Sequence, residues 1–507
     1  MSDLRRRDGD AGTAQHAASR LRSRRRFLGD MGMGVTGMAL AALLDRDGWR
    51  PSGSAQAATP DPLAANEATG PHGRLPVRKP RIRSVIWLFM AGGVSHMESF
   101  DPKPALNRYA GKSLADTPWK DVYESPFVKE NFRPFVDGNT RTFRQQIYPL
   151  QVGFHRHGQS GLEISDWWPH VATCADDLAI VRSLWTTDND HGAQLQFHTG
   201  RHISDGYFPT IGSWVHYGLG TLNENLPQFI AMGAPIGDCC GGTQVHRANY
   251  LGAEYDGVYL QEKNPLPFGE PGVEIFREEQ QADLGLIQQL NRLAEVEYPS
   301  DPALRARIKS YELAFRMQMS VPEVFDFRDE SAATQAAYGD GFGRQLLAAR
   351  RFVERGVRFV QVYHGGGSGG AWDAHSGLRE NHTQNCAQVD KPIAALLKDL
   401  KQRGMLEETM VVWGTEFGRT PGTEGSDGRD HHPFGFSCWF AGGGVRGGMA
   451  HGATDELGLL ASEHPHYVTD VHATVLHQLG IDSHALELPG RKRLELEHGR
   501  PIVEILR

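Results

Sequence analysis

The first residues that could do chemistry follow a glycine-rich stretch, HGGGSGGAWDAH, at 364–375. Its glycines let the backbone turn closely and place Asp373 and His375 two positions apart. Further along the chain, GTEFGR supplies Glu416, and GRDHHP supplies one more carboxylate and two adjacent imidazoles. Carboxylates and imidazoles bind metals and transfer protons, so these three segments form the main candidate site.

We expect this group to hold a divalent metal. Mixed carboxylate and imidazole ligands suit zinc, manganese or iron, whereas carboxylates alone favour calcium or magnesium, so zinc or manganese is expected first and calcium is the alternative. A lone histidine among the 23 of this chain is more often an ordinary hydrogen-bonding residue, and only the joint placement on three loops favours ligation. The expected ligands are Asp373, His375, Glu416 and His432, with His431, Asp430 and Asp101 as further candidates.

Three more residues are candidates for binding an anionic substrate. Arg419 follows Glu416 closely, Arg201 follows Thr199-Gly200, and His96 lies in the loop after the first strong apolar run. The forked donors of a guanidinium clamp oxyanions, and the alternative for each arginine is an ion pair with a neighbouring carboxylate.

Helices alternate with strands around these loops. Apolar spacing predicts a helix over 342–353 that ends at Gly356 and a strand over 357–363. The order repeats with a helix over 389–400 that ends at Gly404 and a strand over 409–413. Helices between strands imply a parallel sheet, and ligands bind beyond the carboxyl ends of its strands, where the candidate ligands stand.

Two earlier apolar runs also lead into polar segments. The run 85–90 (VIWLFM) predicts a strand buried on both faces, and the run 178–184 precedes TTDNDHG at 186–192 and a helix-like stretch that closes at 198–201. Residues 220–300 are loop-rich and are interpreted as an insertion or a substrate-facing subdomain. A helix is expected from Asp301-Pro302 to a stop at Pro322.

Composition sets the broad class. A chain of 507 residues predicts one large α/β domain with insertions, or a domain with a smaller subdomain. The net charge of -8 leaves no basic surplus, so no nucleic-acid partner is expected. The 5 cysteines have neither the density of a disulfide framework nor the spacing of a zinc ribbon.

The amino terminus has the order of an export signal. Basic residues load the first 26 positions and precede an apolar run from Met31 to Leu44, which is shorter than the roughly 20 residues that span a bilayer. The segment SRRRFL at 23–28 resembles a twin-arginine signal, and cleavage is expected after Ala57. Residues 1–57 are therefore the expected signal peptide and 58–80 a Pro/Gly/Ala-rich tether. We expect export by the twin-arginine route to the periplasm or beyond, with membrane contact only through the export machinery.

Several phrases together resemble a known family. These are the strand VIWLFM, AQLQFHTGR at 193–201, AWDAH at 371–375, TEFGRTP at 415–421, GRDHHP at 428–433 and DVHATVLHQLGI at 470–481. They resemble the bacterial sulfatase-like family called domain of unknown function 1501, within the alkaline phosphatase and sulfatase superfamily, over roughly residues 81–505. The resemblance implies a central, mostly parallel sheet sandwiched by helices, a divalent metal at the strand ends, and hydrolysis of sulfate or phosphate esters.

The same resemblance suggests roles for single residues. Asp373, His375 and His432 resemble one metal's ligand set, and Glu416 stands where a second metal binds in the superfamily. Phe417 replaces the other ligand of that second metal, and Ala91-Gly92 replace an acidic ligand after the first strand, which leaves His96, Glu98 or Asp101 as substitutes.

The chain lacks the CxPxR segment in which sulfatases form their formylglycine, so that mechanism is excluded. Asp190 stands at the position of the formylglycine cysteine. Nucleophilic attack is therefore assigned to Thr186, Thr187 or Asp190 beside His191, or to hydroxide generated at the metal without a covalent intermediate.

The sequence thus favours an exported metal-dependent hydrolase of small or polymeric anionic esters. The alternatives are a non-catalytic binding protein that keeps a metal site on a sulfatase-like scaffold, and a purely structural metal that holds glycine-rich loops.

Overall fold

The computed structural model describes residues 78–134, 144–261, 263–265, 277–297, 302–486, 488 and 498–507. All of them belong to one unit, Asn66–Arg507. The expected signal peptide 1–57 lies outside the described residues, as does the expected tether up to residue 77. No helix in the described part of the chain has the length and apolar character needed to cross a membrane.

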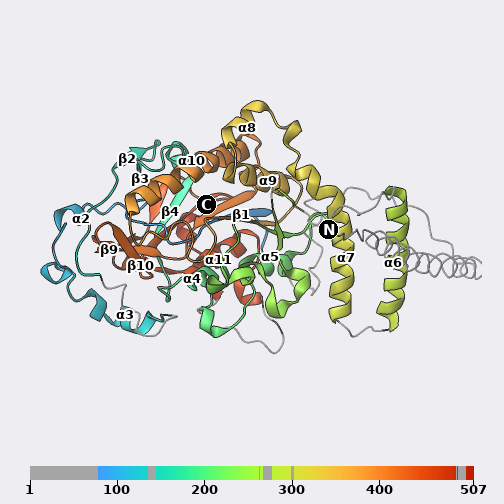
Figure 1. Cartoon of the computed structure of the whole chain (residues 1–507), viewed down its shortest axis with the longest axis horizontal. Coiled ribbons are helices and arrows are strands. Elements are labelled where there is room, and N and C mark those ends of the chain that lie inside the picture. The colour runs from blue at the N-terminus through green and yellow to red at the C-terminus, as the bar shows by residue number, and fades with distance from the viewer. Residues whose placement is uncertain are drawn as a thin grey trace, which may run out of the picture. The chain divides into compact units, whose positions relative to one another are not determined.

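A nine-stranded sheet runs through the protein, in the order β12-β4-β11-β8-β1-β7-β5-β6 with β15 beside β4 (Figure 1). Neighbouring strands are parallel except that β11 runs antiparallel to both β8 and β4. The expected mostly parallel sheet is confirmed. The strands are β1 Ser84–Met90, β4 Leu178–Trp185, β5 Phe229–Gly233, β6 Val258–Leu260, β7 Phe359–His364, β8 Thr409–Gly414, β11 Phe436–Gly442, β12 Met449–His451 and β15 His466–Tyr467.

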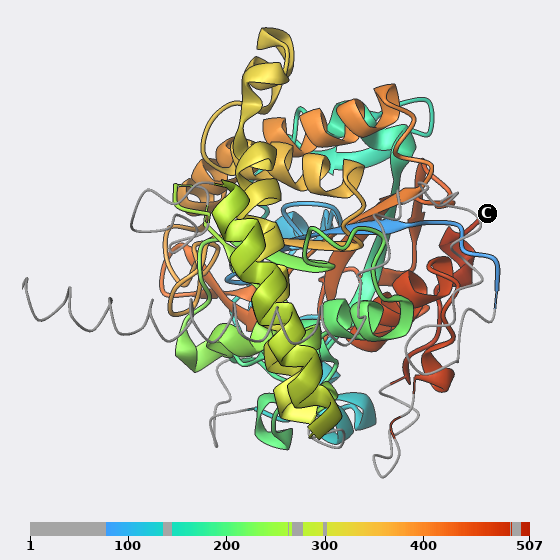
Figure 2. The same ribbon diagram turned by 90° about the vertical axis from the view of Figure 1, so that its right-hand side faces the viewer.

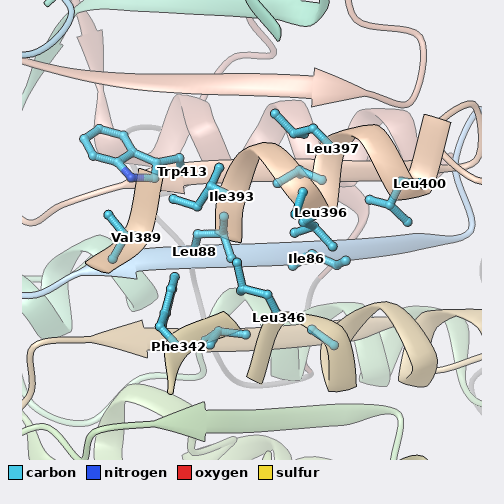
Figure 3. Packing of buried hydrophobic residues seen from close by; sticks show 14 of the residues in the cluster. Ile86, Leu88, Phe342, Leu346, Val389, Ile393, Leu396, Leu397, Leu400 and Trp413 are labelled. Carbon is cyan, nitrogen blue, oxygen red and sulfur yellow. The ribbon is translucent and has the colours of Figure 1, made fainter. Parts of the chain in front are cut away.

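Helices cover both faces of the sheet because its central strands are apolar on both sides. Every residue of β1 is buried, with Ile86 and Leu88 on one face and Trp87 and Phe89 on the other. The first face packs on α9 (Phe342–Glu354) and α10 (Leu378–Gln402), as Figure 3 shows. The second face packs on α4 (Ala193–Thr199), α5 (Ile211–Leu219) and α11 (Val468–Gln478). The expected α/β sandwich is therefore confirmed.

Most predicted elements around the site are confirmed within a few residues. The strands expected at 85–90, 178–184, 357–363 and 409–413 are β1, β4, β7 and β8, and the helix expected at 342–353 is α9. The helix expected at 389–400 is the second half of α10, which begins well before it, at Leu378. Gly356 and Gly404 follow these helices with φ of 87° and 70°, a conformation that glycine adopts without strain.

The helix expected to stop at Pro322 runs on to its end at Phe325 as α7 (Pro302–Phe325). Val321 and Val324, on either side of the proline, are fully buried in the core. Apolar packing there outweighs the helix-breaking tendency of proline, so the predicted stop was wrong. The expected cap, Asp301, lies outside the described residues.

The segment 220–300 contributes more than loops. Its two short strands, β5 and β6, extend the central sheet beyond β7, and its 21-residue helix α6 (Arg277–Glu297) runs beside α7 (Figures 1 and 2). Strands of five and three residues carry too little periodicity to be read from sequence.

Smaller elements surround this core. A hairpin of β9 (Gly418–Glu424) and β10 (Gly428–His432) follows β8 and carries part of the candidate site. The others are α2 Ala105–Arg108, α3 Pro126–Asn131, β2 Phe154–His157, β3 Leu162–Ser165, α8 Ala332–Tyr338, β13 Ala453–Thr454 and β14 Ala461–Glu463.

Candidate metal centre

Four side chains from three loops meet beyond the carboxyl ends of the central strands. His191 follows β4, Asp373 and His375 follow β7, and His431 lies on β10 of the hairpin after β8. One ligand atom from each lies within 4.8 Å of the others. The three imidazoles surround one carboxylate: His375 Nε2 and His431 Nε2 each lie 3.0 Å from Asp373 Oδ1, and His191 Nε2 lies 3.2 Å from Asp373 Oδ2.

Each of these imidazoles also makes a hydrogen bond through its other ring nitrogen, Nδ1. In every case the Nδ1 atom faces an oxygen that can only accept, so Nδ1 carries a proton and Nε2 is the atom left to face the cluster. This is the arrangement in which histidines bind metals, with the second nitrogen oriented by a carboxylate or a carbonyl. The acceptors are the Glu416 carboxylate for His191 (3.2 Å), the Glu424 carboxylate for His375, and the Asn189 carbonyl for His431 (2.6 Å).

The facing nitrogens are closer than bare lone pairs allow. His375 Nε2 and His431 Nε2 are 2.9 Å apart, a separation at which they share a proton or bind the same cation. His191 Nε2 is buried and lies 3.2 Å from Asp373 Oδ2. A metal ion could be bound by both of these atoms.

The electrostatics of the cluster favour positive charge. Burial raises the pKa of Asp373, but contacts with three histidines and the Arg419 charge hold it far below its ordinary value. Burial lowers the pKa of His191, yet the carboxylates of Asp373 and Glu416 raise it to about 9. The pKa of His375 is raised, first by its contact with Asp373, whereas burial holds that of His431 well below the usual value. His191 and His375 therefore favour the protonated form, and a bound metal cation would replace their Nε2 protons.

Glycines bring the loops together at this point. Gly369 has a φ of 95°, and a Cβ added there would lie 3.1 Å from Asp373 Oδ2 and 3.2 Å from His191 Nε2. Gly92, with a φ of 121°, would press a Cβ against the backbone of Asp373 at 2.5 Å. The glycine-rich stretch seen in the sequence thus lets the backbone approach the cluster closely.

The site opens to solvent on one side. The side chains of His375 and Asp373 are 36% and 23% exposed, whereas that of His431 is 8% exposed. A substrate could therefore reach the cluster from the side of His375.

Two expected ligands occupy other places. Glu416 is fully buried and accepts from Gly92 N at 2.8 Å, from Gln194 Nε2 at 3.2 Å and from His191, so it orients a ligand rather than facing the cluster. His432 donates Nε2–H to the Leu459 carbonyl at 2.5 Å, and burial lowers its pKa to about 4. The sequence favoured His432 as the metal ligand, but in the structure the adjacent His431 lies in the cluster instead.

Asp101 and His96, which follow β1, and Asp430, which lies in the β9–β10 hairpin, make contacts with residues outside the cluster. Asp101 pairs with Lys103 at 2.9 Å, and His96 Nε2 lies 3.1 Å from the Gly458 carbonyl. Asp430 accepts from Arg144 Nε at 2.9 Å, and burial raises its pKa. The structure brings none of these three side chains into the four-residue cluster.

Some of the expected catalytic and substrate-binding residues lie in or next to the cluster, and others make contacts elsewhere. His191 lies in the cluster, and Asp190 precedes it with a partly exposed side chain. Thr187 Oγ1 accepts a hydrogen bond from Gln196 Nε2 at 2.8 Å, and Arg201 lies over the Phe208 ring at 4.1 Å from its centroid. Arg419 does not reach the surface, and its guanidinium donates to Asp373 Oδ1 at 2.8 Å.

Sequence reasoning missed the residues behind the ligands. Glu424, Asn189 and Arg144 orient the cluster through contacts across the β9–β10 hairpin and the β4 loop. Their spacing along the chain carries no signal, because these contacts exist only once the loops have met.

Comparison with known proteins places the chain in a family. The model of the family described as a protein of unknown function (DUF1501) matches residues 82–506, and the chain belongs to that family. Comparison with curated protein sequences gives no match.

Solved structures with a similar fold include alkaline phosphatase superfamily members and sulfatases. A Vibrio parahaemolyticus protein of the alkaline phosphatase superfamily matches with 10% identity and a TM-score of 0.35, covering 88% of this chain and 75% of that one. The alkaline phosphatase of the Antarctic bacterium TAB5 matches with 8% identity and a TM-score of 0.33, over 79% and 99% of the two chains. The PsFucS1 sulfatase from Pseudoalteromonas sp. matches with 13% identity and a TM-score of 0.30, over 80% and 68%.

Proposed function

We propose that this protein is an exported, metal-dependent hydrolase of sulfate or phosphate esters. The observation that carries the proposal is the convergence of three imidazole Nε2 atoms on one carboxylate, with each Nδ1 held by an acceptor. Such preorganised donors are costly to assemble unless they bind something positive.

The donor set fits a transition metal. Asp373, His191, His375 and His431 would supply three nitrogens and carboxylate oxygen, a set that suits zinc or manganese better than the all-oxygen sites of calcium. A divalent metal supplies Lewis acidity, which lowers the pKa of water and offsets the negative charge of an ester.

The chain's own residues position this centre and leave one side open. Arg419 holds the Asp373 carboxylate, and Glu416 and Glu424 fix the His191 and His375 rings. The exposed edge of His375 leaves room for an anionic ester, small or polymeric, to approach. Asp190, partly exposed and adjacent to His191, is the candidate for proton transfer, whereas Thr187 is buried and its hydroxyl already accepts a hydrogen bond from Gln196.

Adjacent histidines offer a matched test of the site. His431→Gln should lose bound zinc and all hydrolysis of aryl sulfate and aryl phosphate esters. His432→Gln should keep both, because a glutamine nitrogen can still donate to the Leu459 carbonyl. Metal content is measured by plasma mass spectrometry and hydrolysis by release of the phenol. Equal loss in both variants, or zinc retained in His431→Gln, would refute this ligand set.

A second candidate is a binding protein that retains the metal without turnover. The engagement of Thr187 by Gln196 favours it, because a hydroxyl held in a buried hydrogen bond is a poor nucleophile. Protein that binds one ester tightly in the presence of metal, but releases no product from any sulfate or phosphate ester, would establish this reading.

The export part of the proposal depends on the first 57 residues. The SRRRFL segment followed by a short apolar run supports passage through the twin-arginine route to the periplasm or the medium. Because this route carries folded proteins, the metal centre could form before export.

A further inference from the structure

The geometry points to a single divalent metal per chain, because two arginine side chains occupy the positions on either side of the cluster where further cations would bind. This inference rests on the proposed metal centre and specifies how many ions it takes. Arg419 lies on the inner side of the cluster and Arg144 on the outer side.

Arg419 fills the inner position. Its guanidinium is fully buried and donates to Asp373 Oδ1 at 2.8 Å, and also to four backbone carbonyls. These oxygens are already engaged by the guanidinium. The positive charge of the guanidinium repels a second metal cation. The carbonyls are those of Gly92, Gly93 at 2.8 Å, Trp372 at 3.2 Å and Arg429 at 3.0 Å.

Arg144 fills the outer position. His375, Glu424 and Asp430 form a second group whose ligand atoms lie within 4.8 Å of one another, and it shares His375 with the first group. Arg144 pairs with both carboxylates of this group, at 2.8 Å from Asp430 Oδ2. A metal could enter only by displacing the guanidinium from two carboxylates at once.

The buried carboxylate of Glu416, next to the cluster, is already engaged on both oxygens. Glu416 accepts from Gly92 N, Gln194 and His191 together, and its other oxygen accepts from Thr415 at 3.0 Å. In the described part of the chain, Asp373 is the carboxylate that groups with His191, His375 and His431.

The test counts metal. Wild type, Asp373→Ala, Arg144→Ala and Arg144→Lys are saturated with Mn²⁺, freed of excess by gel filtration and measured by plasma mass spectrometry. Subtracting the Asp373→Ala value removes ions bound elsewhere. We expect about one ion per chain for wild type and Arg144→Lys, and about two for Arg144→Ala, which frees Glu424 and Asp430. Arg156→Ala, an exposed arginine on β2, serves as the control and should stay at the wild-type value.

The outcomes separate this inference from the proposed function. A wild-type value of about two overturns the single-metal inference and leaves the hydrolase proposal standing. An Arg144→Ala value equal to wild type overturns the role of Arg144. No ion in wild type overturns the inference together with the metal centre itself. Thermal unfolding of each variant shows that the fold is retained.

Discussion

Glu416 and Glu424 orient the rings of His191 and His375, and we expect the more buried of these two carboxylates to contribute more to metal affinity. Glu424 is 21% exposed and holds the His375 ring, which is 36% exposed, whereas Glu416 is fully buried and holds the His191 ring, which is 15% exposed. Loss of such a partner weakens metal binding about 10- to 100-fold. Water can solvate the exposed His375 ring, so Glu424→Gln should cost about tenfold, or about 1.4 kcal/mol. Glu416→Gln should cost about 100-fold, or about 2.7 kcal/mol.

Competition with a chromogenic zinc chelator at fixed pH and salt gives the dissociation constants. Glu407→Gln, an exposed glutamate away from the site, is the control and should bind zinc as the wild type does. Urea unfolding is measured in parallel, because Glu424→Gln also removes a partly exposed ion pair with Arg144 worth about 1 kcal/mol or less. Zinc affinities that do not change, or a larger loss in Glu424→Gln than in Glu416→Gln, would refute the reasoning.

Three further predictions concern pH, stability and export. Because the pKa of His191 is raised to about 9 in metal-free protein, a metal must displace its proton, so calorimetry should show zinc affinity rising with pH up to about 9 and then levelling. Glu330→Gln should destabilise the protein by about 3 kcal/mol in urea unfolding, because it leaves the buried Arg350 guanidinium without a main partner. Burial raises the pKa of Glu330, but contacts with Arg350 and Arg351 outweigh this effect and lower the pKa overall. The stabilisation from this carboxylate is therefore present above the unfolded-state pKa and is lost as pH falls through the folded-state pKa, so the stability of the variant should depend less on pH in acid. Replacing Arg24 and Arg25 together by lysine should leave the protein in the cytoplasm, and fractionation with equal export of variant and wild type would contradict the twin-arginine assignment.

Long periodic segments were predictable because local patterns specify them. The helices α9 and α10 have buried faces at helical spacing and end before glycines, and β1, β7 and β8 are continuous apolar runs. Helices between such strands force a parallel sheet, which in turn puts the loops of Asp373 and Glu416 at one edge. β5 and β6 were missed because strands of five and three residues carry almost no periodic signal.

The sequence predicted which segments form the site, but not the role of each residue in it. Asp373, His375 and His431 were expected near a metal, and the structure brings them together. His191 was expected as a catalytic residue, and its place among the ligands depends on how the loop after β4 folds back onto Gly369. Arg419 was expected to bind substrate, but full burial leaves it facing the Asp373 carboxylate and the backbone instead.

The sequence by itself determined which segments carry ligands, because residue type and spacing decide where carboxylates and imidazoles follow strands. Tertiary structure alone decided which ligand of each segment faces the cluster. His431 and His432 are adjacent on β10, and successive side chains of a strand point to opposite faces, so only one of them can face Asp373. The choice depends on pairing with β9, where His431 lies opposite Arg419 after an irregularity that begins at Arg429. A shift of one residue in that pairing would exchange the two histidines, and nothing local in GRDHHP specifies the register.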